Sequence, residues 1–162
     1  MKTTAATASP QRKTSFTLTS TAYQEGQAIP AKYTCKGEDV SPPFSWSGLH
    51  PNAKSLAFVL DDPDAPGGTW THWTFWNLPA SAKGLEEEAD VTDAGAVQGL
   101  TSSKGIGYHG PCPPSGTHRY IATLYALSQP LTLREGATVQ QLRSALTGRV
   151  LAQAKLTGTF TK

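Results

Sequence analysis

Stretches rich in β-branched and aromatic residues recur along the chain, and turn residues such as Gly, Pro, Asn and Asp separate them. Such stretches are typical of β-strands. They predict five strands, at Ser15–Thr19, Ser55–Leu60, Thr69–Leu78, His118–Leu127 and Lys155–Phe160. Fifteen glycines and twelve prolines are spread over the 162 residues, which favours many short strands joined by turns. We therefore expect a mostly antiparallel β fold with one or two peripheral helices.

One segment has the apolar spacing of a helix. Thr138 and Gln141 fit a capping box, and Val139, Leu142, Leu146 and Val150 follow at helical intervals. Gly148 costs a helix interior about 1 kcal/mol, so the far end of this helix is less favourable. The acidic segment "GLEEEAD" at 84–90 is typical of an exposed turn.

Composition and charge narrow the class of protein. The length indicates one domain, which we place at residues 15–162. A net charge of +2 with scattered basic residues argues against a nucleic-acid partner, and no apolar run is long enough to insert stably in a membrane. Residues 1–14 have low complexity and lack the apolar segment of a signal peptide, so we predict a disordered tail on a cytoplasmic protein.

The two cysteines lie in loops rich in Gly and Pro. In a reducing compartment the default expectation for Cys35 and Cys112 is two free thiols. A single bridge between the two loops is the alternative.

A G-x-G-x-x-G pattern at Gly105, Gly107 and Gly110 resembles a dinucleotide-binding loop. Such a loop needs a helix to begin at its third glycine. Here Pro111, Pro113 and Pro114 follow, and a strand comes next, so no helix N-terminus is available to bind a phosphate. The pattern therefore does not indicate a nucleotide-binding site.

Three short segments carry candidate chemistry, and the first is "LDDPDAP". Asp61, Asp62 and Asp64 end an apolar strand, and Pro63 and Pro66 hold them in a rigid turn. They either cap the turn or contribute to a site. Three carboxylates at one strand end repel one another, so we expect a positive group to face at least one of them.

The second and third segments are strands that contain histidine. A period of two places His72 on one face with Trp70, Thr74 and Trp76, so that Trp73 points to the opposite face. His72 is then either a core histidine or a pocket residue. In "THRY", His118 and Tyr120 share a face at the end of a rigid loop and Arg119 points away.

If these strands are neighbours, their polar groups converge on a site for a small anion. An imidazolium and a phenol donate hydrogen bonds to the anion, and an Asp behind a His fixes its tautomer and raises its pKa. Metal ligation and a hydrolase triad use the same residues, but the metal-ligand spacing and the G-x-S-x-G motif are both absent. We expect no cofactor, no metal and no catalytic residue.

The motifs "DPDAP", aromatic-x-His and "PPSGTHRY", in that order, resemble those of the phosphatidylethanolamine-binding protein family, which includes the Raf kinase inhibitor protein. "YTCKGEDVSPPFSW", "GPCPPSGTHRY" and "AKLTGTF" are most similar to its bacterial and archaeal branch. The resemblance spans about residues 16–160. It implies a β-sandwich of two antiparallel sheets, one a Greek key, with a few short helices and a small anion pocket. The pocket residues implied are Asp62, Asp64, Pro66, Trp70, His72, Cys112, His118 and Tyr120.

The chain departs from many animal members at two places in this pocket. Thr71-His72 replaces a pair of histidines, and Pro111-Cys112 replaces a Ser-Gly pair. Pro111 has no N–H, so only Cys112 can donate from that pair.

The resemblance implies a non-enzymatic protein, a monomer or homodimer, that binds a phosphate-like anion, such as a phospholipid headgroup or a phosphorylated ligand. The alternative is a protease or kinase inhibitor that acts through its surface, and the third is a hydrolase of small esters. If the histidines must be protonated, phosphate affinity weakens as the pH rises through about 6.5.

Overall fold

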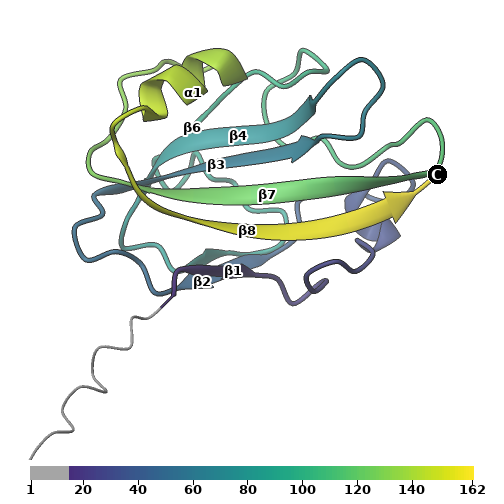
Figure 1. Ribbon diagram of the computed structural model, residues 1–162, viewed down its shortest axis with the longest axis horizontal. Coiled ribbons are helices and arrows are strands. Elements are labelled where there is room, and N and C mark those ends of the chain that lie inside the picture. The colour runs from purple at the N-terminus through teal and green to yellow at the C-terminus, as the bar shows by residue number, and fades with distance from the viewer. Residues whose placement is uncertain (1–14) are drawn as a thin grey trace, which may run out of the picture.

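The computed structural model describes residues 15–162, which form two antiparallel sheets packed face to face (Figure 1). The predicted N-terminal tail, residues 1–14, lies outside the described residues. The elements are β1 (Thr17–Thr19), η2 (Ala31–Tyr33), β2 (Phe44–Ser47), β3 (Ser55–Asp62), β4 (Trp70–Pro79), β5 (Gly84–Leu85), β6 (Val97–Gln98), β7 (Thr117–Leu127), α1 (Val139–Leu146) and β8 (Val150–Thr161). The mostly β, two-sheet fold expected from the sequence is confirmed. No helix of residues 15–162 is long and apolar enough to cross a bilayer.

The larger sheet has the order β6-β4-β3-β7-β8, and the smaller one has the order β1-β2-β5. β3 is antiparallel to both of its neighbours, β4 and β7. The last residues of β3 therefore lie beside the first residues of β4 and β7. This topology brings the three candidate segments of the sequence to one edge of the sheet.

Two apolar layers hold the sandwich together. Along β3, Leu56, Phe58 and Leu60 face the smaller sheet, while Ala57 and Val59 face α1. The rings of Phe58 and Phe75 stack at 5.0 Å in the layer between the sheets. Because each such side chain contributes about 1.5–3 kcal/mol when fully buried, these layers supply most of the driving force for folding. Figure 1 shows the larger sheet between α1 and the smaller sheet.

The main strands match the prediction to within two residues at most ends, but β8 starts five residues earlier than expected. Val150, predicted to continue the helix, is the first residue of β8. The helix ends at Leu146, and Gly148 follows with φ of 79°, a left-handed conformation that turns the chain back toward the sheet. The capping box is confirmed, since Thr138 and Gln141 bond reciprocally.

The sequence did not predict β2, β5 and β6, which have four, two and two residues. The acidic segment begins as β5 instead of lying wholly in a turn. A side chain at Gly84 would meet the Phe44 carbonyl at 2.6 Å, so only glycine lets β5 approach β2 this closely. Such short pairings depend on contacts with distant residues, which local patterns do not reveal.

The strict two-residue alternation predicted for β4 is wrong, because the strand contains irregularities. Leu60 is opposite Trp73 and Asp61 is opposite Thr71, so His72 is an extra residue on β4. A bulge of this kind breaks the alternation of side chains. His72 therefore contacts Tyr120 in the same layer that contains Trp73, although the alternation placed His72 and Trp73 on opposite faces.

Candidate functional site

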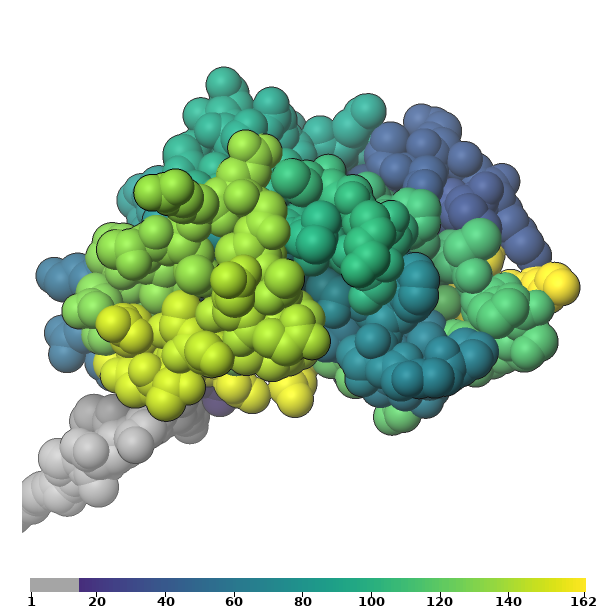
Figure 2. All heavy atoms as spheres, turned by 90° about the horizontal axis from the view of Figure 1, so that it is seen from above, coloured from purple at the N-terminus to yellow at the C-terminus, as the bar shows by residue number. Residues whose placement is uncertain are grey.

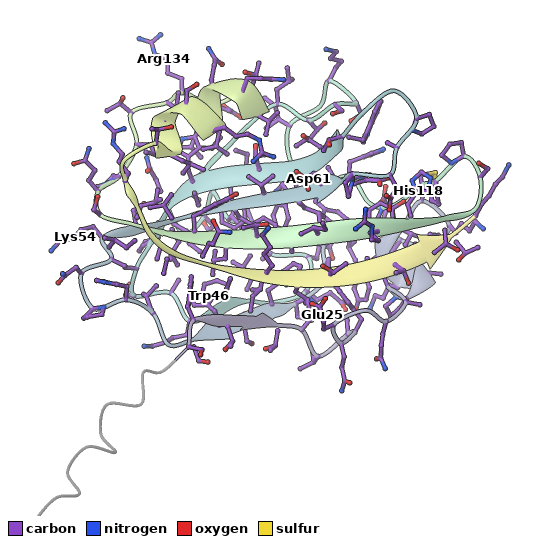
Figure 3. All side chains as sticks on the ribbon, viewed as in Figure 1. Glu25, Trp46, Lys54, Asp61, His118 and Arg134 are labelled. Carbon is purple, nitrogen blue, oxygen red and sulfur yellow. A yellow bond between two sulfur atoms is a disulfide. The ribbon has the colours of Figure 1, made fainter. Side chains whose placement is uncertain are left out.

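A cavity of about 380 Å³ lies where the end of β3 meets the first residues of β4 and β7. It is lined by Asp62, Ala65, Pro66, Trp70, His72, His109, Cys112, Pro113, Pro114, His118 and Tyr120. In Figure 2 the turn near residues 63–69 lies beside the segment near residues 112–118, toward the end of the molecule away from α1. Figure 3 places His118 at this end and Lys54 at the other.

The structure brings seven of the eight predicted site residues to this cavity, Asp64 being the exception. Four further lining residues are not among those that the sequence predicts: His109, Pro113, Pro114 and Ala65. The two prolines belong to the motif "PPSGTHRY", which places them a few residues before His118 in a rigid loop. His109 gave no signal in the sequence apart from its position next to Gly110.

The strand ends hold Asp62 and His118 in a buried pair. Nδ1 of His118 is 2.6 Å from Oδ2 of Asp62, and the two residues are 6% and 3% exposed. Asp62 also accepts the backbone N–H of Asp64 through Oδ1 at 2.8 Å. A carboxylate at Nδ1 fixes the tautomer of His118, so that Nε2 is the ring nitrogen left for a ligand.

The three aspartates of "LDDPDAP" each have a different cationic or titratable partner. Asp61 accepts a hydrogen bond from Arg143, Asp62 pairs with His118, and Asp64 pairs with Arg119. The expectation that a positive group faces at least one of them is confirmed. Asp61 and Asp62 are neighbours in a strand, so their side chains lie on opposite faces, and the charge of Asp62 is the smallest of the causes that shift the pKa of Asp61.

Asp64 does not line the cavity, although the resemblance placed it among the pocket residues. Its carboxylate accepts hydrogen bonds from the backbone N–H, Nε and Nη2 of Arg119. The Arg119 side chain and backbone lower the pKa of Asp64 to about 2. Asp64 therefore joins the β3–β4 turn to the start of β7 from outside the cavity.

His72 is buried and is oriented by backbone groups of His109. Its Nδ1 is 2.6 Å from the His109 carbonyl oxygen, and its own carbonyl accepts the His109 N–H. Burial lowers the pKa of His72. In the neutral form Nδ1–H donates to that carbonyl and Nε2 presents a lone pair. His72 must therefore take up a proton before Nε2 can donate to an anion.

Tyr120 offers a polar group that no neighbour satisfies. Among the described residues its hydroxyl oxygen is buried and without a hydrogen-bond partner. Burial raises the pKa of Tyr120, and the Asp62 and Asp64 charges raise it further. The backbone N–H of Cys112 approaches this hydroxyl and lowers the same pKa, although the two groups do not form a well-aligned hydrogen bond. An unsatisfied buried hydroxyl is an expected feature of a site that binds a polar ligand.

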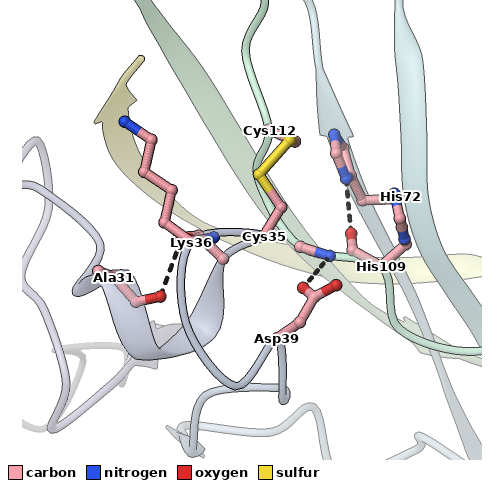
Figure 4. The surroundings of a disulfide bond; sticks show 9 residues. Ala31, Cys35, Lys36, Asp39, His72, His109 and Cys112 are labelled. Carbon is pink, nitrogen blue, oxygen red and sulfur yellow. Dashed lines mark hydrogen bonds between the residues drawn. A yellow bond between two sulfur atoms is a disulfide. The ribbon is translucent and has the colours of Figure 1, made fainter.

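Cys35 and Cys112 form a disulfide, so the default expectation of two free thiols is wrong (Figure 4). The Cys35 N–H also donates to the Pro111 carbonyl, and the Gly110 N–H donates to Asp39. Folding places the two Cα atoms 5.5 Å apart, within bonding range. Because the two cysteines are 77 residues apart in the sequence, no local pattern indicates that they are close in the fold. The bridge ties the cavity wall to the loop after η2.

The described residues contain no group of three or more His, Cys, Asp and Glu side chains arranged to hold a metal ion. The cavity contains three imidazoles, one phenol and the Cys112 N–H around a partly apolar hollow. Such groups can donate hydrogen bonds to oxygen atoms of a small anion.

The fold and the site together define a β-sandwich binding domain with a pocket at one sheet edge. The phosphatidylethanolamine-binding protein family model matches residues 19–161. The chain therefore belongs to the phosphatidylethanolamine-binding protein family.

Relatives occur in archaea and bacteria, as the sequence resemblance implied. A UPF0098 protein of Methanothermobacter thermautotrophicus is 49% identical over 86% of this chain and 94% of its own length. A UPF0098 protein of Chlamydia muridarum is 44% identical over 88% of this chain and 97% of its own length.

Two solved structures share the fold. A putative phosphatidylethanolamine-binding protein homolog from Chlamydia trachomatis has a TM-score of 0.87 at 42% identity, over 91% of this chain and 98% of that one. YbcL of E. coli, described as a member of the mammalian family, has a TM-score of 0.85 at 30% identity, over 92% of this chain and 99% of its own.

Proposed function

We propose that this protein binds a small oxyanion, phosphate or a phosphate monoester, in the cavity between His72 and His118. One observation carries the proposal. The buried Asp62–His118 pair lies in the same cavity as the unsatisfied hydroxyl of Tyr120. With Asp62 accepting from Nδ1–H, the Nε2–H of a His118 imidazolium is left to donate to a ligand, and Tyr120 has a hydrogen bond to give. An anion would satisfy both groups.

The shape of the cavity suits an anion that carries an organic group. Its polar groups come from β3, β4, β7 and the loop before β7, whereas Pro66, Pro113 and Pro114 form the apolar wall. Trp70 is 40% exposed and also lines the cavity. Because a volume of about 380 Å³ exceeds what a bare phosphate fills, the rest of a monoester would contact the apolar wall.

The same groups favour binding over catalysis. Nδ1 of both histidines is held, by Asp62 in one case and by the His109 carbonyl in the other. Cys112 is in the disulfide, so it supplies no thiolate. Nucleophilic catalysis needs a hydroxyl or thiol bonded to a base, and none of the hydrogen bonds of His72 and His118 in the described chain has that form.

Calorimetric titration of inorganic phosphate into the wild-type protein and the His118→Gln variant tests this proposal. We expect the variant to bind phosphate at least about tenfold more weakly, since a charge-assisted hydrogen bond is lost. His50→Gln is the matched control, because His50 lies in the loop before β3, at the opposite end of the sheet from the cavity. Equal affinities for the wild type and His118→Gln would contradict the proposal.

A further inference from the structure

A third imidazole lies in the cavity, and none of the three segments that carry the candidate chemistry includes it. His109 lines the wall beside His72, and the two rings lie nearly parallel, 11° apart in plane, with centroids separated by 6.1 Å (Figure 4). In the described part of the chain the ring of His109 makes no hydrogen bond. It is partly exposed, so it is accessible to a ligand in the cavity.

The backbone of His109 has a structural role that its side chain does not share. Its N–H and C=O both bond to His72, which any residue except proline can do. Gly110 follows, and a Cβ there would meet the Tyr33 carbonyl oxygen at 2.3 Å. The fold therefore fixes where the His109 side chain begins but gives no packing reason for an imidazole at that place.

The charges around the two rings explain what an imidazole does there. Positive charge on His109 opposes protonation of His72, while Asp62 and Asp39 favour it. Asp62 is already paired with His118, and Asp39 accepts the Gly110 N–H. Tyr120, whose ring meets that of His72 edge to face, is neutral because burial raises its pKa. Two protonated rings at this spacing therefore need further negative charge, which an anion in the cavity supplies.

An anion with two negative charges offsets both rings, whereas an anion with one charge offsets only one. We propose, on the basis of the proposed anion site, that His109 makes the cavity selective for tetrahedral dianions, such as phosphate monoesters, over carboxylates. His109 acts by adding a second cation beside His72. This role needs the charge of the side chain and not its shape.

Sulfate and acetate are the probes, because sulfate remains a dianion and acetate a monoanion across the relevant pH range. We measure both affinities by calorimetry near pH 6 for the wild type, His109→Gln and the His50→Gln control. His109→Gln should bind sulfate about tenfold more weakly and acetate less than about threefold more weakly. His50→Gln should leave both affinities unchanged.

Two further measurements separate charge from structure. His109→Lys keeps a cation at this position and should retain the preference for sulfate. Titrations in buffers of different ionisation enthalpy should show that the wild type takes up more protons per sulfate bound than His109→Gln does. Melting curves of all variants report whether each one is folded.

The outcomes distinguish this inference from the proposed function. A wild type that binds sulfate with a selectivity unaltered in His109→Gln overturns the role of His109 and leaves the anion site intact. A wild type that binds neither phosphate nor sulfate overturns both.

Discussion

Oδ2 of Asp62 and Nδ1 of His118 lie 2.6 Å apart, and the antiparallel pairing of β3 with β7 places them there. Asp62 is the last residue of β3, and His118, 56 residues later in the sequence, is the second residue of β7. Both side chains are almost fully buried, so the interaction is weakly screened by solvent. This pair holds Nδ1 of His118 and leaves Nε2 as the ring nitrogen that can meet a ligand.

Asp62→Asn should weaken phosphate binding and flatten its pH dependence. The amide oxygen can still accept the Asp64 N–H, but its NH₂ group then faces Nδ1 of His118, which has to adopt the other tautomer. His118 would donate from Nε2 while neutral and without the support of a carboxylate. We expect at least about tenfold weaker binding and a stability loss of about 2 kcal/mol, measured by calorimetry and urea unfolding.

Asp64→Asn is the matched control, since it removes a carboxylate two residues away. Asp64 faces Arg119 and not the cavity, so phosphate affinity should change less than about twofold. A loss of affinity as large as that of Asp62→Asn would show that the turn and not the Asp62–His118 pair governs binding.

Five of the strands could be predicted from sequence because they depend on local signals, and the convergence of the site could be predicted only on the condition that these strands are neighbours. A proline-rich turn ends β3 at Asp62, and a proline-rich loop precedes the start of β7 next to His118. Alternation along β7 puts His118 and Tyr120 on one face. Antiparallel neighbours then bring strand ends together. The resemblance to a known family implied the arrangement in two antiparallel sheets.

The rest depends on contacts between distant residues. The bulge at His72 follows from how β3 and β4 pair, and period-two reasoning has no means to find it. The disulfide joins cysteines 77 residues apart, and only the folded chain shows their loops in contact. His109 enters the cavity because Gly110 packs against Tyr33, which is again a contact between distant segments.

Reduction of the disulfide should destabilise the protein. A bridge that spans 77 residues restricts the unfolded chain, with an expected contribution of about 4 kcal/mol. For a chain of this size that loss corresponds to a fall in Tm on the order of 10 °C. Scanning calorimetry with and without a phosphine reductant measures it.

A double variant, Cys35→Ser with Cys112→Ser, separates the bridge from other effects of the reductant. Its Tm should equal that of the reduced wild type and should not respond to the reductant. If the reductant lowers the Tm of both proteins equally, the bridge is not the cause.

Gly110→Ala should destabilise the cavity wall, whereas Gly105→Ala should not. At Gly110 an added Cβ meets the Tyr33 carbonyl oxygen and Asp39 Oδ1 at 2.3 Å each, and the carbonyl is backbone that cannot yield cheaply. At Gly105 the nearest heavy atom to an added Cβ is 3.9 Å away. We expect a loss of about 2 kcal/mol for Gly110→Ala and a change within about 0.5 kcal/mol for Gly105→Ala, by urea unfolding. Equal effects would mean that the wall adjusts to the added methyl group.

His72 should make the protein less stable in acid. Burial lowers the pKa of His72 in the folded state, so the unfolded chain takes up the proton first as the pH falls. The contribution of the neutral ring is complete above an unfolded-state pKa of about 6.5, declines as the pH falls through it and levels off below the folded-state pKa. The stability advantage of the wild type over His72→Gln, from urea unfolding, should therefore shrink between about pH 8 and about pH 5.

Saturating sulfate should reduce or reverse that trend, because a bound dianion favours the protonated ring and stabilises the folded state more strongly as the pH falls. The same coupling requires sulfate affinity to rise in acid for the wild type and to rise less for His72→Gln. If the advantage of the wild type instead grows as the pH falls without sulfate, His72 is protonated more readily in the fold than in the unfolded chain. Burial would then not be the dominant influence on its pKa, and a proton would already be present on His72 before any anion binds.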